Sequence, residues 1–444
     1  MKKLILSFVV FTSLICASFA ENFFAHRFFE IKVDVPVEVS NNLLGITDIM
    51  KKDVVIDLAE IADSVKDKGA ALKGIVAPSV SIGLDIPRGL IFGVKVGAEA
   101  DVGVGLSDDL FTFVGKGNMA LEDPNKMEVR TSNTYADIFA TASLNAGWNT
   151  KKSRLEFIAT AFSSLAHLDA TNTYAKLYIN DETNTISYEA NVGANLYSNV
   201  NFVSGLDDVQ AIINSITNNM GFDLSANYKR DLFRFLTIGA NARIPLVPSK
   251  LSLCSAVSYN KSGEINIDQF LRSSEGQTNP DDQNSGNVPP VNEPDETEET
   301  SDSMNVKDML GNPVLLAEPY AIHRPLKFGV SANFHPFGTL LSTKGYIGIG
   351  IRHPFANAIN AATDISETDF YVDYSIGGRL SLWNILSLEL THECMDEIYK
   401  NQLALALNIR LVEVDAGVSM ASTNFTKSFT GAGLGAFVTV AVGF

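Results

Sequence analysis

The stretch LIFGVKVGAEADVGVGL, residues 90–106, decides the fold of this chain. Apolar side chains alternate in it with small or charged ones over its whole length. One face carries Phe92, Val94, Val96, Ala98, Ala100, Val102, Val104 and Leu106, and the other carries Gly93, Lys95, Gly97, Glu99, Asp101, Gly103 and Gly105. Because successive side chains of a β-strand point to opposite sides, this stretch forms one apolar wall and one polar wall.

The same alternation recurs along the chain. Strong examples are residues 30–39, 137–148, 186–196, 236–244, 326–334, 370–382, 403–411, 414–420 and 434–444, and weaker ones are 77–86, 153–166, 221–230, 250–260, 345–352 and 385–394. Strands of about 9 to 11 residues suit a tilted crossing of the hydrocarbon layer, whereas the strands of a soluble sandwich are usually about 5 to 6. Lipid cannot satisfy an open strand edge, so such a sheet must close. The sequence therefore predicts an all-β fold, a transmembrane antiparallel β-barrel of about 14–16 strands with short helical insertions.

The two ends of the chain predict export to the outer membrane. Lys2 and Lys3, the apolar run 4–16 and the small-residue pattern 18–20 read as a signal peptide of residues 1–20. Lipidation of Cys16 is the alternative, although Ile15 before it is a poor fit. The remaining residues, 21–444, then form a single barrel domain whose last strand ends in Phe444. A terminal Phe on such a strand resembles the signal that the barrel-assembly machinery recognises.

Composition excludes some partners. The chain has 34 Lys and Arg against 51 Asp and Glu, a net charge of −17, and it loses two lysines with the signal. Such a charge repels nucleic acid. Cys254 and Cys394 are the only cysteines of the mature chain, and the sequence does not say whether they pair.

Three segments break the alternation. Residues 46–69 carry Leu58, Ile61, Ala62 and Val65 at helical spacing, and this insertion is either a surface helix of a loop or a plug inside the lumen. A second short helix is predicted over 206–218. Residues 273–306 hold nine acidic residues, four prolines and no basic residue, which predicts a disordered acidic loop outside the membrane. Calcium capture near 295–302 is the alternative there, but the spacing matches no calcium loop.

Motifs for chemistry are mostly absent. There is no Gly-x-Ser-x-Gly elbow and no phosphate-binding loop, His392-Glu393 lacks the second histidine of a zinc helix, and the six histidines are scattered. We therefore expect no enzyme activity, no catalytic residues, no cofactor and no metal. The candidate functional residues are charged side chains on the polar face of their strands: Lys95, Glu99, Asp101, Arg243, Arg379, Glu389, Arg410 and Asp415. Facing the lumen, they set ion preference or pair across neighbouring strands.

The chain resembles the FadL-like group of outer-membrane barrels, and in particular its spirochaete-type relatives. The resemblance lies in the strand 30–39, the insertion 46–69, the segment from Asp109-Leu110-Phe111 to Gly115-Lys116-Gly117-Asn118, and the strand ending at Phe444. It implies a barrel of about 14 strands that passes hydrophobic compounds and has an N-terminal plug. The chain departs from the group in beginning a strand close to its mature N-terminus and in lacking an Asn-Pro-Ala signature.

These observations predict a protein of the bacterial outer membrane that passively transports small or hydrophobic solutes, in a FadL-like or porin-like way. Its expected partners are outer-membrane lipid, a hydrophobic small-molecule ligand and, through Phe444, the barrel-assembly machinery. The alternative is a surface-exposed structural or binding barrel that displays extracellular loops, such as 273–306, without transport.

Overall fold

The computed structural model describes residues 27–43, 58–66, 69–170, 173–180, 185–199, 213–214, 217–266, 312–351, 370–395, 397–430 and 433–444. Nineteen strands in these ranges form one antiparallel sheet. They are β1 (Phe29–Asn41), β2 (Ala70–Val76), β3 (Ser79–Asp85), β4 (Leu90–Leu106), β5 (Lys126–Asn149), β6 (Ser153–Asp169), β7 (Tyr174–Asn180), β8 (Thr185–Ser198), β9 (Gly221–Phe233), β10 (Leu236–Val247), β11 (Ser249–Asn266), β12 (Val314–Ile322), β13 (Leu326–Phe334), β14 (Leu341–Ile351), β15 (Phe370–Leu382), β16 (Leu386–Met395), β17 (Ile398–Asn408), β18 (Val412–Ser422) and β19 (Gly433–Gly443).

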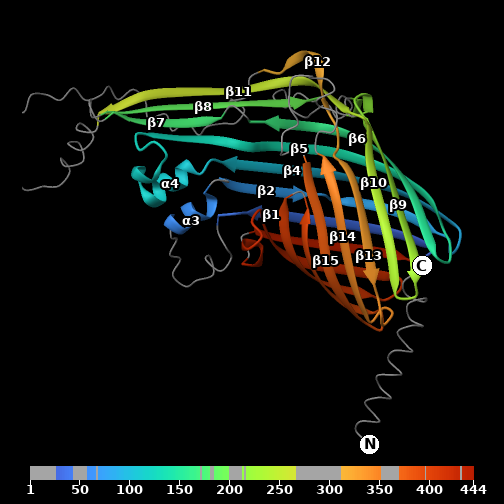
Figure 1. Ribbon diagram of the computed structural model, residues 1–444. Helices are drawn as coiled ribbons and strands as arrows, with labels where there is room; N and C mark the ends of the chain where they lie inside the picture. Colours follow the sequence, from blue (N-terminus) through green and yellow to red (C-terminus); the bar gives the residue numbers. More distant parts are fainter. Residues whose placement is uncertain are drawn as a thin grey trace, which may run out of the picture.

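The sheet closes on itself because β1 pairs with β19 on one side and with β2 and β3 on the other. Five positions in the ring each hold two successive strands, one following the other along the barrel wall: β2/β3, β6/β7, β8/β9, β10/β11 and β12/β13. The nineteen described strands therefore occupy 14 positions around the ring. The predicted antiparallel barrel of about 14–16 strands is confirmed (Figure 1).

The outer face of the ring is apolar, as the alternation predicts. Leu390, Leu405 and Val418, on three different strands, have exposed fractions of 60%, 54% and 61%. In the same strands the alternating side chains of Ala404 and Ser419 are buried toward the inside. A soluble fold would cover these large side chains, so this belt is the surface that meets lipid.

The two ends of the barrel differ in their connections. Very short turns join the strands at the end where Phe29 pairs with Phe444, and the C-terminus lies there (Figure 1). At the opposite end several connections between described strands are long, as between β1 and β2 or between β11 and β12, while the one between β16 and β17 is short. Outer-membrane barrels have short periplasmic turns and long outer loops, so the end with the C-terminus is the periplasmic one.

One side of the barrel is taller than the rest. β5, β7, β8 and β11 continue past the outer rim as a projecting sheet (Figure 1). Its strands are tied by polar contacts as well as by the ladder. The Tyr174 hydroxyl donates to Glu189 Oε1 at 2.7 Å, and this hydrogen bond raises the pKa of the Tyr174 phenol.

Two α-helices lie at the outer end within the described residues: α3 (Leu58–Val65), between β1 and β2, and α4 (Asp109–Lys116), between β4 and β5 (Figure 1). They pack on each other so closely that a Cβ on Gly115 would lie 2.3 Å from the Leu58 carbonyl oxygen. Lys116 also pairs with Asp63. None of the described helices is long and apolar enough to span a membrane.

Several predicted features lie outside the described residues. These are the signal peptide 1–20 and the acidic loop 273–306, together with most of the predicted helix 206–218. Of the insertion 46–69, the structure describes α3, Lys66 directly after it, and Gly69 directly before β2.

Candidate functional site

The inner wall of the barrel is polar and charged. On β4, Lys95, Glu99 and Asp101 alternate with the exposed apolar residues of the outer face. Arg243, Arg379, Glu389 and Asp415 hold the same inward position in their own strands. Seven of the eight candidate residues therefore project from the inner side of the strands that carry them.

The strand assignment of the eighth candidate, Arg410, is wrong. β17 ends at Asn408 and β18 begins at Val412, so Arg410 lies in the turn between them. Its φ is 69°, and its side chain is exposed at the periplasmic end. Ile409 and Leu411 in this turn are also apolar, so the alternation of residues 403–411 continues past the last residue of β17. The sequence pattern therefore does not indicate where the strand ends.

A buried arginine that the sequence did not reveal crosses the lumen. Arg324 lies between β12 and β13, where its Nη1 donates to Asp223 Oδ2 at 2.7 Å. Its Nη2 donates to both carboxylate oxygens of Glu99, at 2.8 and 2.9 Å. Four ring positions separate the β12/β13 position from β4, so the contact with Glu99 must pass through the interior. We call these three residues the Arg324 bridge.

The two carboxylates of the bridge have different surroundings. The side chain of Asp223 is fully buried, whereas that of Glu99 is 41% exposed. The guanidinium carbon of Arg324 lies 5.8 Å from the centre of the buried Phe162 ring, and Phe139 packs edge-on against that ring at 6.0 Å. Asp223 is thus the enclosed partner of Arg324, and Glu99 is the partner that solvent reaches.

Arg243 fixes the backbone that carries Arg324. Its Nε donates to the carbonyl oxygen of Pro325, at 3.0 Å, directly after Arg324 in the chain. Proline lacks a backbone N–H, so a strand position is easily interrupted at such a residue. The interruption between β12 and β13 lets the Arg324 side chain leave the wall and reach across.

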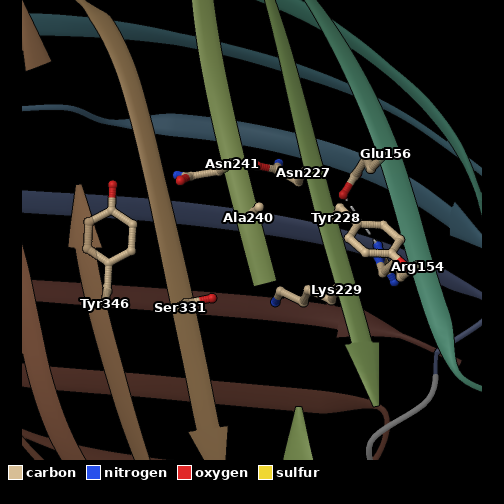
Figure 2. A pocket seen from close by; sticks show the side chains of 9 residues that line it. All are labelled: Arg154, Glu156, Asn227, Tyr228, Lys229, Ala240, Asn241, Ser331 and Tyr346. Atoms are coloured by element: carbon tan, nitrogen blue, oxygen red, sulfur yellow. Dashed lines mark ion pairs between the residues drawn. The ribbon is translucent and has the colours of Figure 1, made fainter. Parts of the chain in front are cut away.

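Three hollows open along the inner wall. The first, of ≈ 380 Å³, has six charged residues in its lining: Glu30, Lys95, Glu99, Glu156, Arg243 and Arg324. The second, of ≈ 410 Å³, is lined on its polar side by Arg154, Glu156, Asn227, Lys229, Asn241, Ser331 and Tyr346 (Figure 2). These side chains come from β6, β9, β10, β13 and β14. Figure 2 shows the ion pair between Arg154 and Glu156 among them.

The third hollow, of ≈ 480 Å³, lies on the other side of the ring and contains two further candidates, Glu389 and Asp415. Lys344 pairs with Glu389 there, and Lys400 contacts both Glu38, at 3.0 Å, and Glu393, at 2.6 Å. One oxygen of Asp415 is buried and makes no hydrogen bond within the described residues. These contacts run between neighbouring or nearby strands and so tie the wall together.

Two candidates, Arg379 and Asp101, line none of the three hollows. Arg379 donates to the Ser387 hydroxyl at 3.1 Å and lies 4.0 Å from Glu389. Asp101 accepts a hydrogen bond from Tyr135 at 3.2 Å. The structure therefore brings Lys95, Glu99 and Arg243 together in one hollow, and Glu389 and Asp415 in another.

Within the described residues no cluster of His, Cys, Asp or Glu is arranged to hold a metal ion. Cys254 and Cys394 do not form a disulfide with each other. The charged lumen is thus the feature that the described chain offers to a solute.

A closed antiparallel ring with an apolar outer belt and a charged lumen is a transmembrane β-barrel, and the protein is one of the bacterial outer membrane. No protein-family model matches the chain, and neither does any curated protein. The structure is similar to solved toluene transporters, TbuX of Ralstonia pickettii (9% identity, 94% of this chain and 90% of that chain, TM-score 0.43) and TodX of Pseudomonas putida (10%, 94% and 89%, 0.41). It is also similar to a Pseudomonas aeruginosa FadL homologue (8%, 93% and 89%, 0.35). A FadL protein is thus among the matches, as the sequence resemblance predicts, and the likeness is one of fold.

Proposed function

We propose that the protein passively transports small solutes across the outer membrane through its lumen. The observation that carries this proposal is the lining of that lumen, where charged and amide side chains from many strands surround three hollows. Apolar molecules gain nothing from such walls, because they would displace water from charged groups without replacing its hydrogen bonds. The geometry therefore favours polar solutes over the hydrophobic ones that the sequence resemblance implies.

The Arg324 bridge narrows the proposed path. It joins two wall positions that four others separate in the ring, and its guanidinium packs against Phe162. A solute passes this point only when Glu99, the solvent-exposed partner, separates from Arg324. Transport should therefore respond to substitution at Glu99 more than to substitution elsewhere in the lumen.

Planar-bilayer recording on the refolded mature chain tests the proposal. We expect discrete conductance steps for the wild type and larger steps for Glu99→Ala, which removes one side of the constriction. Arg410→Ala, a charge removed from the periplasmic turn, is the control and should conduct as the wild type does. If neither the wild type nor Glu99→Ala conducts, and both are folded, the transport proposal fails.

A second candidate function is display without transport. It is supported by the same bridge, which crosses the lumen, and by the sheet of β5, β7, β8 and β11 that projects beyond the outer rim. Under this proposal Glu99→Ala remains silent in the bilayer, while protease added to intact cells cleaves the projecting part.

The expected assembly partner is also a proposal. Phe444 is 65% exposed at the end of the closing strand, and its ring lies 5.7 Å from that of Phe29. Deleting Phe444 should slow assembly into the membrane in cells and leave refolding into detergent micelles almost unchanged. A defect in both settings would show that Phe444 only stabilises the β1–β19 seam.

A further inference from the structure

We infer that the first hollow holds a binding site for small carboxylate anions, formed by Arg243 and Arg324. This inference rests on the proposed transport function and names the class of solute. It starts from the balance of charge among the residues that line the hollow. Three of them are cationic, Lys95, Arg243 and Arg324, and three are acidic, Glu30, Glu99 and Glu156.

The acidic residues of the hollow are already engaged. Glu30 pairs with Arg27 at 2.8 Å, and Glu156 accepts from Asn145 at 2.5 Å. Glu99 is held by Arg324. None of these carboxylates forms an ion pair with Lys95 or Arg243 in the part of the chain that the structure describes. Lys95 and Arg243 therefore have no ion-pair partner among the described residues, while Arg324 has two, Asp223 and Glu99.

The guanidinium of Arg243 is available to a ligand. Its Nε donates to the Pro325 carbonyl, and its two terminal nitrogens make no hydrogen bond to another described residue. The hydrogen bond at Nε fixes the plane of the group, so the terminal N–H donors are presented in a set direction. A fixed guanidinium with open donors is the group that best recognises a carboxylate.

Arg324 adds an exchangeable position beside it. Asp223, fully buried, holds Nη1 in place, while Nη2 contacts the half-exposed Glu99. Glu99 receives both of its contacts from one nitrogen, so it does not use the paired geometry that makes an arginine–carboxylate contact strongest. A carboxylate from solution can take the place of Glu99 on Nη2 while it binds Arg243. Its arrival would release the contact to β4 that narrows the lumen.

The size and lining of the hollow limit the ligand. A space of ≈ 380 Å³ has room for a small organic anion, and Thr141, Ser143 and Thr160 offer hydroxyl groups around it. A short-chain carboxylate such as butyrate fits this description. Inorganic phosphate shares the oxyanion chemistry and must be distinguished by experiment.

Calorimetric titration of the folded mature barrel in detergent tests the site with butyrate, butyramide and inorganic phosphate. We expect butyrate to bind and the neutral, equally large butyramide not to bind. Arg243→Gln should weaken butyrate binding at least about tenfold, the value of one charge-assisted hydrogen bond. Glu99→Gln should tighten it, because the internal competitor loses its charge. Arg410→Gln removes a charge outside the lumen and should change nothing.

Equal binding of butyrate and butyramide, or no effect of either Arg243→Gln or Glu99→Gln in folded protein, overturns the site. Phosphate binding without butyrate binding overturns its assignment to carboxylates. The bilayer recordings separate this failure from that of the proposed function. Conductance without butyrate binding would contradict the binding site and support transport. Butyrate binding without conductance would support the binding site and contradict transport.

Discussion

The two halves of the ring are built differently. From β14 to β19 each position holds one strand of 10 to 13 residues, and consecutive pairs run without a register shift. From β5 to β13 the positions are longer, most hold two successive strands, and bulges interrupt the pairing, as at Ile138/Phe139 and Pro245/Val247. The regular half is a wall matched to the bilayer. The interrupted half is where side chains leave the wall and reach the interior, as bulges and breaks near functional sites commonly allow.

The largest effect should come from the buried end of the Arg324 bridge, in the interrupted half. Asp223→Ala leaves the guanidinium of Arg324 without its enclosed partner, and breaking a buried ion pair in this way costs about 3–5 kcal/mol. Urea unfolding in lipid vesicles measures this change in the free energy of unfolding.

Asp231→Ala on the same strand is the matched control. Asp231 is exposed and accepts a hydrogen bond from Thr237, so the expected change is below about 1 kcal/mol. Equal losses for the two variants would mean that the bridge contributes nothing special to the interrupted half.

The next effect belongs to the regular half. Leu403→Arg places a charge on the outer face in the middle of β17, which should lower the free energy of unfolding in vesicles by about 2–4 kcal/mol. Tyr259→Arg, on the outer face of the projecting part of β11, should change it by less than about 1 kcal/mol because that part lies beyond the lipid. A large loss at Tyr259 would place the projecting sheet inside the membrane.

The alternation alone predicts the regular half and much of the inner wall. Lys95 and Glu99 lie on one unbroken strand, β4, so the alternation of apolar and polar residues along it predicts that both face the lumen. The alternation does not predict where Arg324 points, because its side chain leaves the wall at the break between β12 and β13, beside Pro325. Its partner Glu99 is on β4, and four ring positions separate the two. Such a contact is known only once the ring is closed. Asp223 belongs to the polar face of a weaker predicted strand, residues 221–230. The neighbouring sequence does not indicate that its side chain is buried.

Close backbone approach distinguishes two glycines, one in each half. On β5, a Cβ at Gly147 would lie 2.2 Å from the carbonyl oxygen of Leu155 and 2.8 Å from the Cα of Glu156, both backbone atoms. Gly147→Ala should therefore lower the free energy of unfolding by about 1–3 kcal/mol. Gly378 on β15 has no atom within 4 Å of such a Cβ, so Gly378→Ala should leave stability unchanged or raise it by up to about 1 kcal/mol. Equal penalties in urea unfolding would show that strand contacts are as tight in the regular half.

The smallest effect should come from Arg410, the arginine of the regular half that turned out not to face the lumen. Its left-handed φ of 69° disfavours any residue with a Cβ, and its side chain is exposed. The backbone of Arg410 accepts a hydrogen bond from Arg27 Nε at 2.9 Å and donates one to Asn408 Oδ1 at 2.9 Å. Arg410→Gly should therefore raise the free energy of unfolding by up to about 1 kcal/mol, whereas Arg410→Ala, which keeps the Cβ, should leave it within about 0.5 kcal/mol of wild type. A loss of stability in both variants would mean that the side chain itself ties the turn, and that this arginine, like Arg324, acts through its guanidinium.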